Sequence, residues 1–158
     1  MDFVLARPDV DPGRLAVAGL SLGGWAALAA ASRQPAVRAV VAMSPVLDPA
    51  RPMGDEGMTQ ELSAEFASPL RDIQPADLRR EWQALTPIHA LARTLADRPI
   101  LLITAGGDQL FPPRHYDGVA DLSPRLDWIR FPRADHVFSD VRPGLCQAVG
   151  SWLLDQLA

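Results

Sequence analysis

The sequence contains no lysine and no asparagine, so all 15 of its basic residues are arginine. We interpret this absence as a composition bias of the source genome rather than as an adaptation. The 19 acidic residues outnumber the arginines and give a net charge of −4. Nucleic-acid-binding domains instead concentrate positive charge. The composition therefore gives no reason to expect a nucleic acid partner.

Cysteine is nearly absent as well. The single Cys146 excludes an internal disulfide framework, and its place in an amphipathic pattern predicts a buried, unreactive thiol. No segment approaches the ~18 consecutive apolar residues of a membrane span, so no membrane partner is expected. The first residues also lack the basic segment and apolar core of a signal peptide. We expect a cytoplasmic protein.

The 158 residues, of which 48 % are hydrophobic and 22 % charged, suit one globular domain spanning residues 1–158. Short apolar runs alternate with helical patterns, which predicts an α/β fold with a mostly parallel sheet and helices on both faces. The expected strands are residues 14–19, 37–43, 99–104 and 126–131. The expected helices are residues 22–33, 58–66, 75–85, 112–122 and 142–157, after a helix tail at residues 3–7.

One motif stands out at the first strand, where Ala-Gly-Leu-Ser-Leu-Gly-Gly joins the strand to the first long helix. The pattern Gly19-x-Ser21-x-Gly23 is the nucleophile elbow, a sharp turn that lifts a serine hydroxyl above the sheet. We expect Ser21 to be strained, and side chains at Gly19 or Gly23 to clash with the crossing backbone. The helix N-terminus would favour negative charge developing near Ser21.

A serine needs a base to remove its proton, and the chain offers three histidines. His136 follows the last expected strand, in the loop position where a base would face the top of the sheet, and is our choice. His89 and His115 are interpreted as surface or packing residues. The base in turn needs an acid to fix its tautomer.

Asp108, which follows the third strand through two glycines, is the expected acid. Asp135 adjoins His136, but neighbouring side chains project in different directions. Asp140 suits the cap of the last helix better. The resulting order is Ser21, Asp108, His136, as in α/β-hydrolases.

These segments resemble esterases of the α/β-hydrolase superfamily that are related to dienelactone hydrolases and to prolyl-oligopeptidase-type catalytic domains. The resemblance rests on the elbow, on Arg-Pro-Ile-Leu-Leu-Ile-Thr-Ala-Gly-Gly-Asp and on Arg-Phe-Pro-Arg-Ala-Asp-His-Val-Phe, although Val137 stands where glycine is more usual. It implies a serine hydrolase that cleaves a small carboxylic ester, lactone or similar acyl compound, with a peptidase, thioesterase or acyltransferase as alternatives. It implies no cofactor and no metal. The backbone N–H of Leu22 would be one oxyanion donor.

Residues 46–98 lie where this family commonly inserts a cap. A cap would supply apolar pocket walls, with substrate-binding candidates Met53, Met58, Leu62, Phe66 and Trp82. The alternative is a crossover helix with an irregular loop and no ligand role.

The strands that precede the elbow in the family are lacking, as is the loop that supplies the first oxyanion donor. The alternative function is therefore a truncated or degenerate hydrolase half that binds or assembles without efficient turnover. The first strand would also have one unpaired edge, apolar on both faces, which can template pairing with another chain. We expect a homo-oligomer, or a requirement for a separate N-terminal half.

Overall fold

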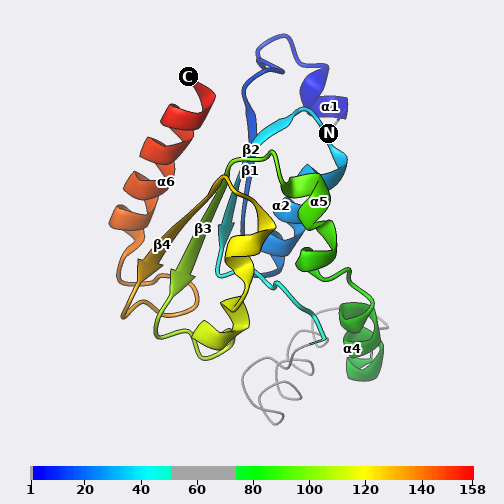
Figure 1. The fold of residues 1–158 in the computed structure, drawn as a ribbon, viewed down its shortest axis with the longest axis vertical. Coiled ribbons are helices and arrows are strands. Elements are labelled where there is room, and N and C mark those ends of the chain that lie inside the picture. The colour runs from blue at the N-terminus through cyan, green and yellow to red at the C-terminus, as the bar shows by residue number, and fades with distance from the viewer. Residues whose placement is uncertain (1, 51–73) are drawn as a thin grey trace.

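The computed structural model describes residues 2–50 and 74–158 and contains a four-stranded parallel sheet in the order β1-β2-β3-β4. The strands all run in the same direction in Figure 1, so their carboxyl ends meet at one edge of the sheet. The fold class predicted from the sequence is confirmed. The strands are β1 (Leu15–Leu20), β2 (Val37–Met43), β3 (Ile100–Ala105) and β4 (Leu126–Phe131).

Burial explains why the two central strands read as continuous apolar runs. Every residue of β3 is buried, and β2 is buried except at Arg38 and Met43. A strand covered on both faces has no polar face to alternate with. The outer strands β1 and β4 are only half-buried, because each has a neighbour on one side alone.

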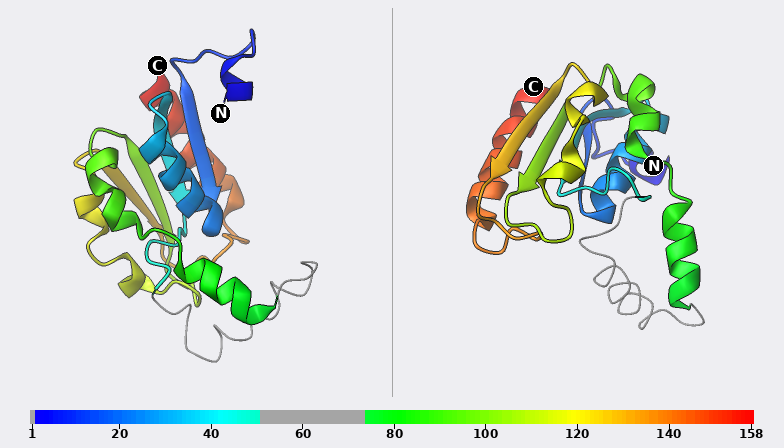
Figure 2. Two further views of the ribbon diagram at one scale, coloured as in Figure 1. Left: turned by 90° about the vertical axis from the view of Figure 1, so that its right-hand side faces the viewer. Right: turned by 60° about the horizontal axis from the view of Figure 1, so that its bottom comes forward.

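Helices cover both faces of this sheet. The C-terminal helix α6 packs on one face, where Trp152 joins Val41, Leu101 and Ile103 in a core cluster. The helix α2 and the segment after α4 cover the other face, where Leu28 packs with residues of all four strands. Figures 1 and 2 show these two layers on opposite sides of the strands. The α-helices are α1 (Asp2–Leu5), α2 (Leu22–Arg33), α4 (Pro75–Gln83), α5 (Ala92–Leu95) and α6 (Arg142–Leu157).

Three sequence-based expectations are wrong. The helix expected at residues 112–122 is two short 3-10 helices, because Gly118 between them has a φ of 79°. Val141, and not Asp140, precedes α6, and no side chain caps that helix. Cys146 is exposed rather than buried. The 3-10 helices are η1 (Ile88–Leu91), η2 (Pro113–Tyr116) and η3 (Val119–Leu122).

The helix expected at residues 58–66 lies outside the described residues. None of the described helices is both long enough and apolar enough to cross a bilayer.

Strand β1 forms one edge of the sheet and pairs only with β2. It is visible at the open edge in the left view of Figure 2. Within β1, Ala18 is exposed, and the other residues are half-buried. Parallel sheets are normally covered on both faces, so their strands are rarely exposed. Among the described residues, the outer row of β1 backbone groups pairs with no other strand, and the same holds for β4 at the opposite edge.

Candidate active site

Ser21 occupies the turn between β1 and α2 in a strained conformation. Its φ of 57° and ψ of −123° are unusual for a residue with a side chain. The backbone holds it there: the Ser21 N–H donates to the carbonyl of Met43 at 2.8 Å, and the Ser21 carbonyl accepts from the N–H of Gly24 at 2.9 Å. Strain sustained by its surroundings is typical of functional turns.

One glycine makes this turn possible. A Cβ at Gly19 would lie 2.0 Å from the carbonyl oxygen of Gly23, far inside any contact that atoms tolerate. The matching expectation for Gly23 is wrong, since nothing lies within 4 Å of a Cβ built there. The second crowded position is Gly24, where a Cβ would lie 2.9 Å from the Cβ of Pro45. Close packing of α2 against the segment after β2 therefore requires the second glycine of the pair.

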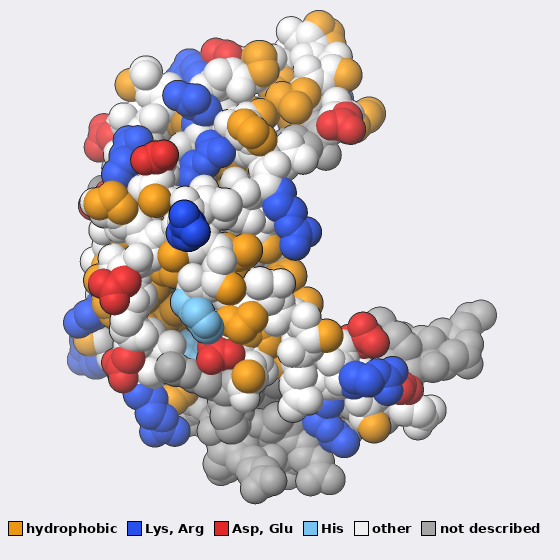
Figure 3. All heavy atoms as spheres, turned by 45° about the vertical axis from the view of Figure 1, so that its right-hand side comes forward, with side chains coloured by type: hydrophobic (Ala, Val, Ile, Leu, Met, Phe, Trp, Pro, Cys, Tyr) orange, Lys and Arg blue, Asp and Glu red, His pale blue; other side chains and the backbone are white. Residues whose placement is uncertain are grey.

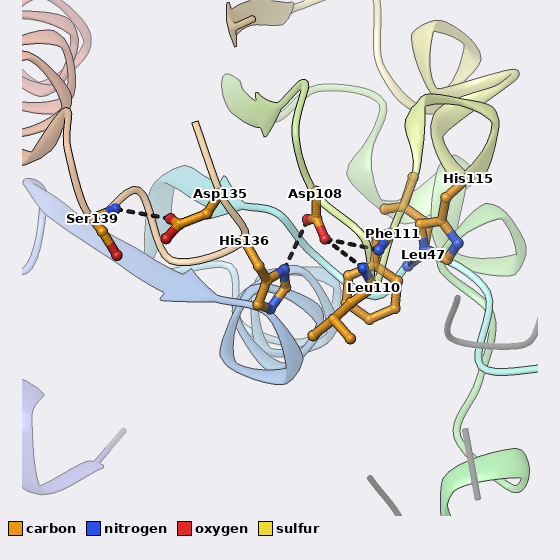
Figure 4. A network of polar contacts seen from close by, with 8 residues as sticks. All are labelled: Leu47, Asp108, Leu110, Phe111, His115, Asp135, His136 and Ser139. Carbon is orange, nitrogen blue, oxygen red and sulfur yellow. Dashed lines mark hydrogen bonds and ion pairs between the residues drawn. The ribbon is translucent and has the colours of Figure 1, made fainter. Parts of the chain in front are cut away.

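Asp108 follows β3, and its carboxylate is fully buried. Oδ1 accepts hydrogen bonds from the backbone N–H groups of Leu110 and Phe111, both at 2.9 Å. Oδ2 lies 2.8 Å from Nδ1 of His136. Figure 4 shows the carboxylate between the imidazole on one side and the two N–H groups on the other. Three contacts therefore fix the orientation of this carboxylate.

His136 lies in the loop between β4 and α6, 28 residues from its Asp108 partner, and its side chain is 14 % exposed. The Phe111 ring meets the imidazole edge-on, with centroids 5.3 Å apart. Nδ1 faces Asp108, so Nε2 is the nitrogen left for a reacting group. Across the described chain, no hydrogen bond joins the Ser21 hydroxyl to His136. Such bonds are often long in enzymes without substrate.

Asp135, the alternative acid, and the other two histidines make contacts away from the Asp108–His136 pair. Asp135 accepts a hydrogen bond from the Ser139 N–H at 2.9 Å, and that bond lowers the pKa of Asp135. His89 is exposed on η1. His115 is buried, and its Nε2 accepts the N–H of Leu47 at 3.0 Å. For His115 the packing interpretation therefore holds and the surface interpretation does not.

The remaining predicted site residues fall into three places. Leu22 is the first residue of α2 and is 42 % exposed. The first N–H groups of a helix have no partner within it, so the N–H of Leu22 can serve a ligand. Trp82 on α4 is half-buried and packs against the core cluster on the α2 face. The substrate-binding candidates Met53, Met58, Leu62 and Phe66 lie outside the described residues.

Figure 3 shows one face of the molecule, on which hydrophobic side chains gather around an exposed histidine side chain. Val137, directly after His136, is 43 % exposed, and Leu22 is 42 % exposed. Within residues 2–50 and 74–158, no group of three His, Cys, Asp or Glu side chains could hold a metal ion.

The sequence analysis did not predict the hydrogen bonds that hold the Asp108 carboxylate in place. The N–H groups of residues two and three positions further on bind its carboxylate, which is the pattern of an Asx turn. The signal was present, because Asp108 begins a non-helical segment that ends at two consecutive prolines, Pro112 and Pro113. Nothing in the local pattern, however, indicates that Phe111 packs against His136.

Tyr116 lies behind this site in the core. Within the described chain its hydroxyl and that of Ser44 are buried and make no hydrogen bond, although they lie near one another. Burial raises the pKa of Tyr116 far above its usual value, and the charge of Asp108 raises it further. Ionisation of Tyr116 is therefore unfavourable in the folded state.

We expect stability to fall above pH 10 because of this residue. There the unfolded chain loses the tyrosine proton and the folded chain keeps it, so unfolding becomes more favourable by up to about 1.4 kcal/mol per pH unit. Below pH 10 the effect vanishes. Tyr116 is the only tyrosine and the chain has no lysine, so few other groups titrate in this range. Urea unfolding of wild type and Tyr116→Phe between pH 8 and 11.5 measures the difference. Parallel curves for the two proteins would contradict the prediction.

Comparisons with known proteins agree with this architecture. The sequence profile of the Prolyl oligopeptidase family matches residues 1–158. A comparison with curated proteins finds no significant match. Among solved structures, acetyl xylan esterase 1 from Thermoanaerobacterium sp. JW/SL YS485 is 21 % identical, with a TM-score of 0.67 over 99 % of this chain and 50 % of that one.

Two further structures show the same fold. The 2,6-dihydroxy-pseudo-oxynicotine hydrolase is 22 % identical, with a TM-score of 0.77 over 99 % of this chain and 44 % of that one. Pyrococcus horikoshii acylaminoacyl peptidase is 18 % identical, with a TM-score of 0.68 over 99 % of this chain and 26 % of that one. The chain thus spans half or less of the length of these three proteins. Its fold is that of the α/β-hydrolases, and by its sequence the chain belongs to the prolyl oligopeptidase family.

Proposed function

We propose that this chain carries the catalytic centre of a serine hydrolase that cleaves carboxylic esters or related acyl compounds. The observation that carries the proposal is the 2.8 Å contact between Nδ1 of His136 and the buried carboxylate of Asp108. This pair comes from two loops at the same sheet edge as the strained Ser21. An acid that fixes an imidazole, at the same sheet edge as a strained serine turn, is the arrangement that nucleophilic acyl transfer uses.

In the proposed mechanism, the Ser21 oxygen attacks the substrate carbonyl carbon while Nε2 of His136 accepts the hydroxyl proton. The N–H of Leu22 donates to the oxyanion that forms, and Asp108 stabilises the imidazolium. Collapse of this intermediate breaks the bond to the leaving group, which takes the proton from His136. Water, deprotonated by the same histidine, then attacks the acyl-enzyme and releases the carboxylic acid and free Ser21.

The experiment that tests this function is labelling with a fluorophosphonate, followed by intact mass measurement. The reagent should add one label to the wild-type chain and none to Ser21→Ala. An Asp135→Asn variant, changed next to His136, should be labelled like wild type. A folded wild-type chain that takes no label would overturn the proposal. It would favour the second candidate, a hydrolase half that binds or assembles without turnover.

The open edge of β1 favours that second candidate. The chain spans about half of the two hydrolase structures described above, and β1 pairs on one side only. Loss of one oxyanion donor typically lowers kcat by ~10²–10³-fold. We propose that further strands beside β1, from a separate N-terminal half or from another copy, complete the sheet.

We predict that the chain alone self-associates through β1 as a homodimer or larger assembly. An exposed strand edge with apolar faces templates pairing, and an exposed lysine blocks it. Sedimentation at several concentrations should show association for wild type and a shift toward monomer for Ala18→Lys, changed at the exposed position of β1. The control is Leu154→Lys, at a 70 % exposed position on α6. Equal association of both variants, or a monomeric wild type, would contradict the prediction.

A further inference from the structure

A polar pocket lies at the opposite end of the sheet from Ser21, Asp108 and His136. Its volume is about 230 Å³, which accommodates a small ion together with water. It is built at the amino ends of β2, β3 and β4, whereas the catalytic residues follow the carboxyl ends of strands. The pocket is lined by Arg38, Thr94, Asp97, Arg98, Pro99 and Arg125.

Positive charge dominates this pocket. Three arginines and one acidic residue, Asp97, line it, in a chain whose net charge is −4. Across the described part of the chain, none of the three guanidinium groups forms an ion pair with a carboxylate. A concentration of unneutralised arginine in a concavity favours an anion, because each guanidinium can donate two parallel hydrogen bonds to it.

Two of these arginines are held in place without losing their charge. Arg98 donates from Nη1 to the backbone carbonyls of Pro35 and Val37, and Arg125 donates from Nη1 to the carbonyl of Asp97 at 3.3 Å. Carbonyl oxygens orient a guanidinium but leave its positive charge uncompensated. Arg38, at the start of β2, is exposed, as are Arg125 and Asp97.

We propose that this pocket binds inorganic phosphate as the hydrogen phosphate dianion. The arginines supply donors for its unprotonated oxygens. Asp97 would repel a fully ionised anion, but its carboxylate can accept the one hydroxyl proton that hydrogen phosphate carries. Sulfate has the same shape and charge and lacks that proton. Because the Asp97 carboxylate lies among the three arginines, the pocket binds phosphate more tightly than sulfate.

Calorimetric titration of the whole chain at fixed ionic strength, free of phosphate buffer, tests the site. We expect saturable binding of phosphate at one site per chain, about tenfold or more tighter than that of sulfate, since hydrogen bonds to charged groups contribute on this scale. Arg38→Gln and Arg125→Gln should each weaken phosphate binding about tenfold or more. Arg130→Gln, an exposed arginine on β4, is the matched control and should leave it unchanged.

Asp97→Asn separates this proposal from general attraction of anions. Removing the carboxylate should tighten sulfate binding and abolish the preference for phosphate. ³¹P NMR line broadening by wild type and by Arg38→Gln gives a second readout that does not depend on heat. Absent saturable binding, equal affinity for phosphate and sulfate in wild type, or an Arg130→Gln effect as large as that of Arg38→Gln would each overturn the proposal. Fluorophosphonate labelling at Ser21 is independent of every one of these outcomes.

Discussion

Replacing Ser21 with alanine is expected to abolish hydrolysis of p-nitrophenyl acetate while leaving the chain as stable as before. In a triad that acts as a unit, loss of the nucleophile costs on the order of 10⁶-fold in kcat. The Ser21 hydroxyl makes no hydrogen bond within the described chain, so its removal leaves no buried partner unsatisfied. Initial rates for both proteins, with thermal unfolding of each, give the two measurements.

The double variant Ser21→Ala/His136→Ala should be little slower than either single variant, for the same reason. His89→Ala keeps most of the activity and serves as the control, because His89 is exposed on η1 away from Asp108. Equal turnover by wild type and Ser21→Ala would show that any measured hydrolysis comes from another group.

A companion substitution measures the strain at this turn. Ser21→Gly should be as inactive as Ser21→Ala but more stable, because glycine adopts a φ of 57° without steric cost. Removing the strain of one residue raises the free energy of unfolding by about 1–3 kcal/mol. Glycine cancels part of this gain, because it gives the unfolded chain more conformational freedom. Urea unfolding of the two variants compares them directly. A less stable Ser21→Gly would mean that the turn stores no strain.

The sequence predicts the bounds of a helix or strand well where the pattern of apolar residues matches the residues that are buried. The strands at residues 37–43 and 126–131 and the helices at residues 22–33 and 142–157 have the expected bounds. Two apolar runs are displaced by one residue, since β1 and β3 each begin and end one position later than expected. A run of apolar residues does not mark where pairing with a neighbour begins. Pairing depends on the register between strands, which is not a local property.

The errors have a common cause in tertiary context. Pro112 and Pro113 suit a helix start, yet Gly118 turns the chain in a way that ends the helix after one turn. Cys146 matches the apolar period of α6 but lies on its exposed side, since the period does not say how wide the packed face is. At the site, chain order predicted the Asp108–His136 pair. The roles of Phe111 and Tyr116 depend on contacts between distant segments, which no local pattern specifies.

Asp108→Asn is expected to lower kcat by about 10⁴-fold, by analogy with the same substitution in a serine protease, and the structure supplies a specific reason. The N–H groups of Leu110 and Phe111 both point at Oδ1. An asparagine must present its carbonyl oxygen to these two donors, because its NH₂ group would leave them buried and unpaired. The NH₂ group is then forced toward Nδ1 of His136.

That orientation reverses the direction of the hydrogen bond between residue 108 and Nδ1 of His136. Nδ1 of His136 must accept from the amide instead of donating to a carboxylate, so the imidazole proton moves to Nε2. Nε2 is the atom that has to accept the proton of Ser21, and it cannot do so while protonated. The variant should keep its fold, since the amide satisfies the same backbone donors. Its substrate binding should change less than its turnover, and kcat and KM measured separately show this split.

Asp135→Asn is the matched control, one residue from His136 and bonded instead to the N–H of Ser139. Its kcat should stay close to that of wild type. Asp108→Ala distinguishes a wrong tautomer from simple loss of charge, because alanine leaves Nδ1 free to keep its proton. If the tautomer explanation holds, Asp108→Ala is no slower than Asp108→Asn. It is less stable, because it leaves the buried N–H of Phe111 without an acceptor, at about 1–3 kcal/mol, and that of the part-buried Leu110 as well. A near-normal rate for Asp108→Asn, or a large loss in Asp135→Asn, would show that Asp108 does not orient the base.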